Sequence, residues 1–136
     1  MTQTPAKILV VDDEAHIVHV VALKLRNAGY TVVTASDGEE ALELAINELP
    51  DLVITDLQMP YLSGLQLCEK LRETKELAHV PAMMLTARGY SIAEEDLART
   101  NIRAVLSKPF SPREVLERTK TMLAELIDEF PEADAA

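Results

Sequence analysis

The sequence predicts an α/β fold in which helices cover both faces of one doubly wound, five-stranded parallel sheet. Five apolar segments alternate along the chain with five segments of helical periodicity, which is the pattern of repeated strand–helix units. The apolar segments are continuous, as expected of parallel strands that are buried on both faces. A chain of 136 residues is long enough for one domain with its own core, so we expect a single domain over 1–136 with a core from about 7 to 127.

The first predicted unit is a strand at Lys7–Val11 followed by a helix within 14–29. The strand is aliphatic and rich in β-branched residues, with polar residues on both sides. Apolar residues recur in the helix at helical spacing, and these are Ile17, Val18, Val21, Leu25 and Ala28. Gly29 follows them and is expected to end the helix as a C-terminal cap.

The second predicted unit is a strand at Thr31–Ala35 and a helix at 37–49. Asp37 is a favourable N-cap residue for this helix. Pro50 ends it, because the residue before a proline avoids helical backbone angles. A third strand is predicted at 51–56.

The same alternation continues in the second half of the chain. The predicted elements there are a helix at 63–74, a strand at 80–86, a helix at 92–100 and a strand at 102–107. The helix at 63–74 has an apolar face of Leu65, Cys68 and Leu71, whereas the helix at 92–100 has few large apolar residues to anchor it.

The last predicted helix begins near Pro112. Its stripe follows the 3.6-residue period of an amphipathic helix and consists of Val115, Leu116, Thr119, Met122, Leu123, Leu126 and Ile127. The following segment, 128–136, is acidic and is expected to form a frayed tail.

Composition excludes several classes of function. Thirteen basic residues against 23 acidic ones give a net charge of −10, and there is no cluster of Lys or Arg, so direct binding to nucleic acid or to an anionic membrane is not expected. No apolar run is long enough to span a bilayer. The single cysteine, Cys68, cannot form an internal disulfide, which favours a cytoplasmic location.

Charged and hydroxyl side chains stand where four of the predicted strands end. They are Asp12, Asp13 and Glu14 after the first strand, Asp56 after the third, Thr86 after the fourth, and Ser107 and Lys108 after the fifth. Ligands of doubly wound sheets bind at the carboxyl ends of the strands. Grouped carboxylates suit Mg²⁺, and a carboxylate beside Mg²⁺ and an ammonium group can attack a phosphoryl group to form an acyl phosphate.

Four motifs at these strand ends resemble those of response regulator receiver domains, the phosphoacceptor modules of two-component signalling. The motifs are VVDDE at 10–14, DLVITDLQMPYLSGLQLCEKLR at 51–72, MMLTA at 83–87 and SKPF at 107–110. The resemblance extends from Lys7 to about Ile127. It implies a flavodoxin-like (βα)5 fold with the strand order 2-1-3-4-5, in which the motifs share one edge of the sheet.

The resemblance also implies a role for individual residues. Asp56 would accept the phosphoryl group, Thr86 would sense it and Lys108 would pair with it. The implied ligands of Mg²⁺, or of Mn²⁺, are Asp12 (through water), Asp13, Asp56 and the backbone oxygen of Gln58. The residues implied to shape the loops are Pro60, Gly64 and Pro109, with a cis bond between Lys108 and Pro109.

One position departs from the pattern of the family. Receiver domains usually have a Tyr or Phe three residues before the lysine of the fifth strand, and this chain has Val105 there. In the family that ring moves when the threonine shifts, so the switch is expected to be altered here. Tyr90 is a candidate source of an aromatic ring nearby.

The implied function is that of a signalling phosphoacceptor, not an enzyme. Its partners would be a histidine kinase or histidine phosphotransfer protein and an unknown output protein, with a weak homodimer through the last helix as a further possibility. One alternative is a pseudo-receiver that binds partners without phosphorylation. Another is a phosphatase of the haloacid dehalogenase type, which is disfavoured because it needs an aspartate where Gln58 stands. The chain contains neither of the glycine-rich nucleotide-binding motifs GxGxxG and GxxxxGK[ST].

Overall fold

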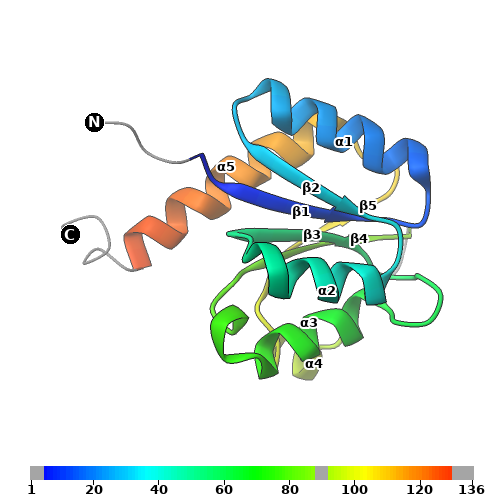
Figure 1. The fold of residues 1–136 in the computed structure, drawn as a ribbon, viewed down its shortest axis with the longest axis vertical. Coiled ribbons are helices and arrows are strands. Elements are labelled where there is room, and N and C mark those ends of the chain that lie inside the picture. The colour runs from blue at the N-terminus through cyan, green and yellow to red at the C-terminus, as the bar shows by residue number, and fades with distance from the viewer. Residues whose placement is uncertain (1–4, 88–91, 130–136) are drawn as a thin grey trace.

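The computed structural model describes residues 5–87 and 92–129 and has the predicted α/β fold. Its centre is one sheet of five parallel strands in the order β2-β1-β3-β4-β5 (Figure 1), which confirms the doubly wound arrangement and the strand order that the resemblance implied. The strands are β1 (Lys7–Val11), β2 (Thr31–Ala35), β3 (Leu52–Asp56), β4 (Ala82–Thr86) and β5 (Ile102–Ser107).

Four α-helices and one short 3-10 helix connect the strands within the described residues, and a fifth α-helix follows β5. They are α1 (Ala15–Asn27), α2 (Gly38–Glu48), α3 (Gly64–Glu73), η1 (Lys75–Leu77), α4 (Glu94–Ala98) and α5 (Pro112–Glu129). In this part of the chain no helix is both long enough and apolar enough to cross a lipid bilayer.

Most ends of the predicted elements differ from the structure by at most one residue, whereas one strand and one helix differ by two residues at an end. The strand predicted at 80–86 begins at Ala82, because Pro81 has no backbone N–H to donate to the ladder. The helix predicted at 92–100 is only five residues long and has no buried residue, in keeping with its shortage of apolar anchors. The 3-10 helix η1 was not predicted. Tyr90 and residues 130–136 of the predicted tail lie outside the described residues.

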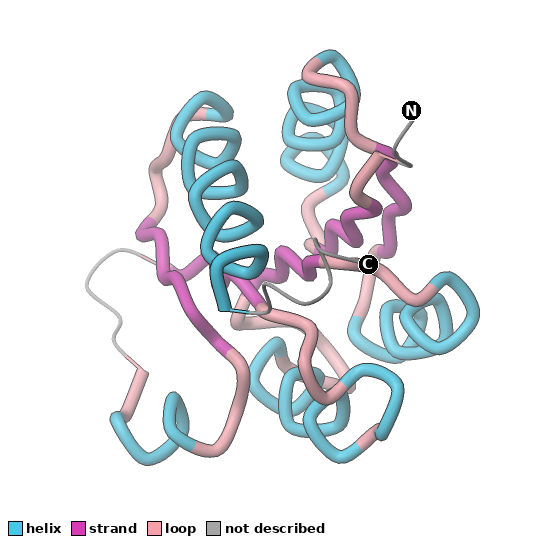
Figure 2. Tube along the Cα trace, turned by 90° about the vertical axis from the view of Figure 1, so that its left-hand side faces the viewer, coloured by secondary structure: helices cyan, strands magenta, loops and turns pink. Residues whose placement is uncertain are grey.

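The sheet is the middle layer of three, with helices on both of its faces (Figure 2). On one face, α1 and α5 pack on the sheet, with Val21, Leu25 and Val115 fully or almost fully buried. On the other face, α2 and α3 pack on the sheet and bury Ala41 and Leu67. The central strands β3 and β4 are buried throughout and β1 is buried after Lys7, as their continuous apolar segments predicted, whereas the edge strands β2 and β5 are only partly buried.

The predicted helix caps are confirmed. Gly29 has φ +103° and its amide donates to the carbonyl of Arg26, so it ends α1 in a conformation that L side chains avoid. Asp37 caps α2 by accepting a hydrogen bond from the backbone N–H of Glu40.

Gly64 brings the start of α3 against the end of β3. Its amide donates to the carbonyl of Leu57 at 2.9 Å. A Cβ at this position would lie 2.2 Å from the carbonyl oxygen of Asp56 and 3.0 Å from the sulfur of Met84. The missing side chain therefore fixes the path of the loop that follows Asp56.

We expect Gly64→Ala to destabilise the fold by about 2–3 kcal/mol, because the added methyl collides with backbone that has little freedom to move. The change should also displace the backbone around Asp56. Chemical denaturation measures the first effect, and amide chemical shifts measure the second.

Gly29→Ala is the matched control, since a Cβ at Gly29 meets no atom within 4 Å. It should cost about 1 kcal/mol through backbone strain alone. The amide shifts around Asp56 should stay in place. An equal disturbance of Asp56 by both variants would contradict the close-packing explanation.

Candidate functional site

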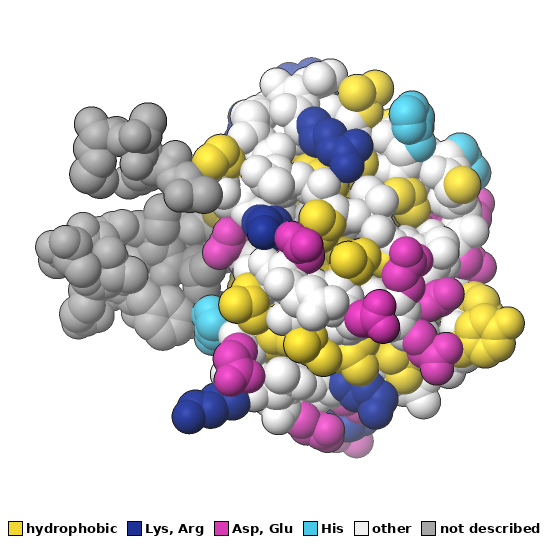
Figure 3. Space-filling view, in the orientation of Figure 1, with side chains coloured by type: hydrophobic (Ala, Val, Ile, Leu, Met, Phe, Trp, Pro, Cys, Tyr) yellow, Lys and Arg dark blue, Asp and Glu magenta, His cyan; other side chains and the backbone are white. Residues whose placement is uncertain are grey.

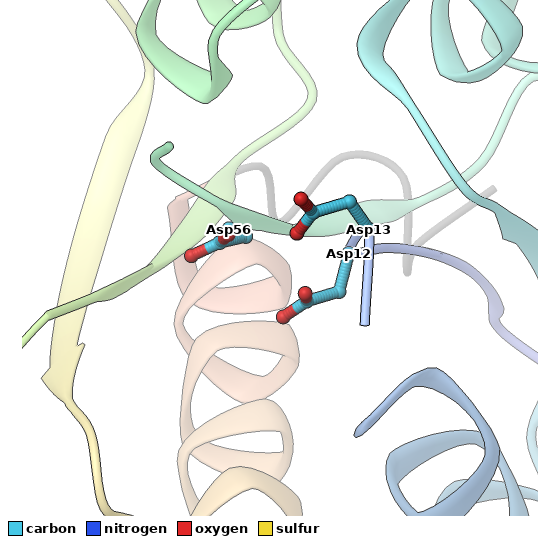
Figure 4. Close-up of side chains that lie close together, drawn as sticks. All are labelled: Asp12, Asp13 and Asp56. Atoms are coloured by element: carbon cyan, nitrogen blue, oxygen red, sulfur yellow. The ribbon is translucent and has the colours of Figure 1, made fainter. Parts of the chain in front are cut away.

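Three aspartate side chains converge at the carboxyl edge of the sheet. Asp12 and Asp13 directly follow β1, and Asp56 is the last residue of β3. The two strands are neighbours and parallel, with Val11 opposite Thr55, so both ends reach the same point. The carboxylates point toward one another (Figure 4), and one oxygen from each lies within 4.8 Å of the others.

Burial makes this cluster unfavourable for negative charge. Asp12 is 0% exposed and Asp56 is 6% exposed, while Asp13 is open to solvent. Desolvation raises the pKa of Asp12 to about 6, although the backbone N–H of Glu14 donates to its Oδ1 at 2.9 Å. Desolvation likewise raises the pKa of Asp56 above its ordinary value. The two carboxylates therefore lack positive charge around them.

Lys108 supplies part of that positive charge. Its Nζ lies 3.3 Å from an oxygen of each of three carboxylates, which belong to Asp12, Asp56 and Glu14. Burial lowers the pKa of Lys108, but the carboxylates of Asp12 and Asp56 outweigh burial and raise the pKa above its ordinary value. The Lys108–Pro109 peptide bond is cis, as the resemblance implied.

Thr86 lies beside the cluster, but its hydroxyl is turned toward the neighbouring strand. The side chain is fully buried, and its Oγ1 donates to the carbonyl oxygen of Leu106 in β5 at 3.4 Å. Val105, the residue that replaces the usual aromatic, is partly buried and packs in the same hydrophobic cluster as Ile92 and Leu97. Leu97 belongs to α4, so Val105 lies on the side of the sheet that α4 covers.

The loop after Asp56 forms another wall of the site. Gln58 and Pro60 line one hollow together with Asp13, which places the predicted loop residues next to the acidic cluster. Tyr61 follows with φ +70° and is 83% exposed, so this loop contains a strained residue that is open to solvent.

Glu14 stands among the acidic residues at the strand ends, but no individual role was predicted for it. The structure brings its side chain into the site. The signal available was its position directly after Asp13, but only the fold shows that its side chain reaches Lys108. Both residues also border a cavity of about 560 Å³ between α1 and the segment that follows β5. The other residues that line it are mainly apolar and include Ile17, Val20, Val21, Pro109, Phe110 and Pro112.

Cys68, His16 and His19 lie apart from the acidic cluster. Cys68 is buried, and desolvation raises the pKa of its thiol to about 12, so it is no nucleophile. His16 and His19 are exposed and do not belong to the carboxylate cluster. On the face shown in Figure 3, acidic side chains gather toward the right-hand side, where strands β1 and β2 end in Figure 1.

Carboxylate oxygens of this kind are the ligands that Mg²⁺ and other hard cations prefer. The group has the composition and proximity that such an ion requires, and Lys108 offsets the charge of its two buried members only in part, since both pKa values stay raised. The residues therefore fit a divalent cation, with Lys108 as a fixed positive charge beside it.

Comparisons with known proteins find similar sequences over most of this chain. The model of the response regulator receiver domain family matches residues 8–120. The alkaline phosphatase synthesis transcriptional regulatory protein PhoP of Bacillus subtilis (strain 168) is 44% identical over 117 residues, covering 86% of this chain and 48% of that protein. The transcriptional regulatory protein ResD of the same organism is 38% identical over 124 residues, covering 90% and 50%. The chain thus spans about half the length of these relatives.

A solved structure is also similar to this chain in fold. The crystal structure of the chemotaxis response regulator CheY4 of Vibrio cholerae is similar with a TM-score of 0.80 at 33% identity, covering 87% of this chain and 98% of that chain.

Because Asp12 is buried, the free energy of unfolding should depend on pH. Between pH 3.8 and about 6 the unfolded chain loses the Asp12 proton while the folded chain keeps it, so stability falls as the pH rises through this window. We expect Asp12→Asn to stabilise the metal-free protein by about 1–3 kcal/mol at pH 7.5. The gain should shrink toward zero near pH 4.

Urea denaturation in the presence of a chelator measures this difference at both pH values. Asp13→Asn is the control, since Asp13 is exposed and its replacement should change the free energy of unfolding by no more than about 0.5 kcal/mol. A destabilised Asp12→Asn variant at pH 7.5 would mean that Lys108 fully compensates the buried charge.

Proposed function

The chain belongs to the response regulator receiver domain family, a family of signalling domains, and on that premise we propose that it is a phosphoacceptor. Asp56 would receive a phosphoryl group from the phosphohistidine of a histidine kinase or of a histidine phosphotransfer protein. The main observation in support of this proposal is that Asp12, Asp13 and Asp56 lie together with the ammonium group of Lys108 at one edge of the sheet.

The donor set supports Mg²⁺, or Mn²⁺, as the cofactor. Its proposed protein ligands are Asp12 (through water), Asp13, Asp56 and the backbone oxygen of Gln58. When bound, such a cation supplies positive charge to the oxygens of the transferring phosphoryl group. The hollow lined by Asp13 and Gln58 leaves this side of the cluster accessible.

The residues of the chain itself would carry out the transfer. A carboxylate oxygen of Asp56 forms a bond to phosphorus while the bond from phosphorus to the donor nitrogen breaks, and the histidine leaves with the electron pair. Lys108 is already within 3.3 Å of Asp56 and would donate to a phosphoryl oxygen. The buried position of Asp56 keeps water away from its carboxylate.

The signal would travel through Thr86 and β5. To donate to the phosphoryl group, the Thr86 hydroxyl has to leave the carbonyl of Leu106, which changes a contact between β4 and β5. Val105 precedes Leu106 in β5, and Val105 and Leu97 of α4 both pack against the same hydrophobic cluster. We propose that a displacement of β5 moves α4 through this shared aliphatic packing, in place of the usual rotation of an aromatic ring.

The cavity beside Lys108 and the surface around α4 are the proposed binding sites for partner proteins. The cavity beside Lys108 is bordered by apolar residues of α1, which would suit a phosphodonor protein that must approach Asp56 closely. The output partner would recognise the surface around α4. The named relatives are transcriptional regulators of about twice the matched length, so an output protein or segment is the expected recipient of the signal. A cytoplasmic location and a weak homodimer through α5 remain predictions.

Phosphorylation itself can be measured by intact mass after incubation with acetyl phosphate and Mg²⁺. We expect one phosphoryl group on the unchanged protein and none on Asp56→Asn, because the amide cannot act as the nucleophile. Asp37→Asn is the matched control and should be phosphorylated normally, since asparagine caps a helix as well as aspartate does.

Released phosphate should be followed in the same reaction, because a short-lived acyl phosphate escapes detection by mass. If neither phosphoprotein nor Asp56-dependent phosphate release is found, the pseudo-receiver alternative replaces this proposal.

The affinity for Mg²⁺ should depend on pH, because a proton on Asp12 removes negative charge that would hold the cation through water. With the pKa of Asp12 at about 6, affinity should be nearly constant above pH 7 and should weaken by up to about tenfold per pH unit below 6. Calorimetric titration with MgCl₂ at pH 7.5 and 5.0 measures the change. Equal affinities at the two values would show that the buried carboxylate is not a ligand.

A further inference from the structure

Lys108 is shared among three carboxylates. Its nitrogen lies 3.3 Å from one oxygen each of Asp12, Glu14 and Asp56. It donates hydrogen bonds to Asp12 and Glu14. A phosphoryl group on Asp56 would therefore have to share the ammonium group with Asp12 and Glu14.

Glu14 is the partner that can be released at the lowest cost. Asp12 is fully buried and Asp56 is nearly so, which means that neither carboxylate can exchange the lysine for water. The side chain of Glu14 is 51% exposed, so its carboxylate is hydrated readily when the ion pair opens. Glu14 also lies outside the aspartate cluster that would hold a cation.

The backbone of Glu14 is fixed while its side chain is directed to Lys108. The amide of Glu14 donates to Asp12, and its carbonyl accepts from Ile17 and Val18 at the start of α1. Glu14 therefore occupies the N-cap position, yet its side chain makes no hydrogen bond to the helix. The carboxylate instead reaches across to a residue 94 positions away in the sequence.

From these contacts we propose that Glu14 is a positioning residue that competes with the phosphoryl group for Lys108. In the unphosphorylated protein it holds the ammonium group toward the rim of the site, between α1 and the segment after β5. Phosphorylation would transfer one lysine donor from Glu14 to a phosphoryl oxygen. Glu14 thus limits how strongly the site binds a phosphoryl group. This role rests on the phosphoacceptor function proposed above.

Three variants separate a contact with Lys108 from a general effect of charge. Glu14→Gln removes the charge of Glu14. Glu14→Asp keeps that charge but shortens the side chain, and aspartate at an N-cap favours the helix N–H groups over the distant lysine. Glu40→Gln removes a charge from another exposed glutamate, which borders a hollow together with Asp12 and Asp13 but has no contact with Lys108.

The measurement is the dissociation constant of beryllium trifluoride, a phosphoryl mimic, at saturating Mg²⁺, together with the rate of phosphorylation by phosphoramidate. In the latter reaction phosphorus moves from nitrogen to an oxygen of Asp56 and ammonia leaves. Glu14→Gln and Glu14→Asp should both bind the mimic about two- to fivefold more tightly, the range that an exposed ion pair allows, and should be phosphorylated faster. Glu40→Gln should change either value by less than about 1.5-fold.

Each other result overturns the proposal. Unchanged or weaker binding by Glu14→Gln means that Glu14 does not compete for Lys108. If Glu14→Asp behaves like the unchanged protein, or Glu40→Gln behaves like Glu14→Gln, then charge alone explains the effect. In these cases the unchanged protein still binds the mimic, so the phosphoacceptor function survives. If the unchanged protein neither binds the mimic nor is phosphorylated, the proposed function and this inference fail together.

Discussion

Two carboxylates that are almost cut off from water, Asp12 and Asp56, face a single ammonium group at the edge of the sheet. Neither carboxylate is stable there as a lone anion, because burial removes most of its hydration. Lys108 compensates only part of this cost, and the pKa of Asp12 accordingly stays raised, at about 6. The remaining shortage of positive charge is the driving force on which the proposed binding of a cation and of a phosphoryl group depends.

The fold maintains this unfavourable arrangement through rigid neighbours. Parallel strands β1 and β3 end side by side, which forces Asp12 and Asp56 together whatever their mutual repulsion. Gly64 then holds the start of α3 against the carbonyl of Asp56, so the loop cannot move away to relieve the repulsion. Apolar packing on both faces of the sheet supplies the stability that the charged edge lacks.

Strand β5 links the charged edge to the far side of the molecule. It leads directly into Lys108, and its Leu106 carbonyl accepts from Thr86. Its Val105 packs against the same hydrophobic cluster as Leu97 of α4. A change in the partners of Lys108 or Thr86 therefore acts on a short strand that shares this cluster with α4. Glu14 adds a further influence, because it shares Lys108 with the two buried carboxylates. The phosphoryl group would thus have to compete with existing contacts at two places before β5 could respond.

Sequence by itself determined the alternation of strands and helices, because the period of apolar residues depends only on local geometry and on burial. It also predicted that Asp12, Asp13, Asp56, Thr86 and Lys108 stand at strand ends, since a strand end is a local property. Contacts between residues that are far apart in the sequence could not be predicted from it. No pattern along the chain shows that Glu14 pairs with Lys108 or that the hydroxyl of Thr86 turns toward Leu106, because strand pairing and side-chain direction decide both. The shortness of α4, by contrast, agrees with the lack of large apolar residues that the sequence already showed.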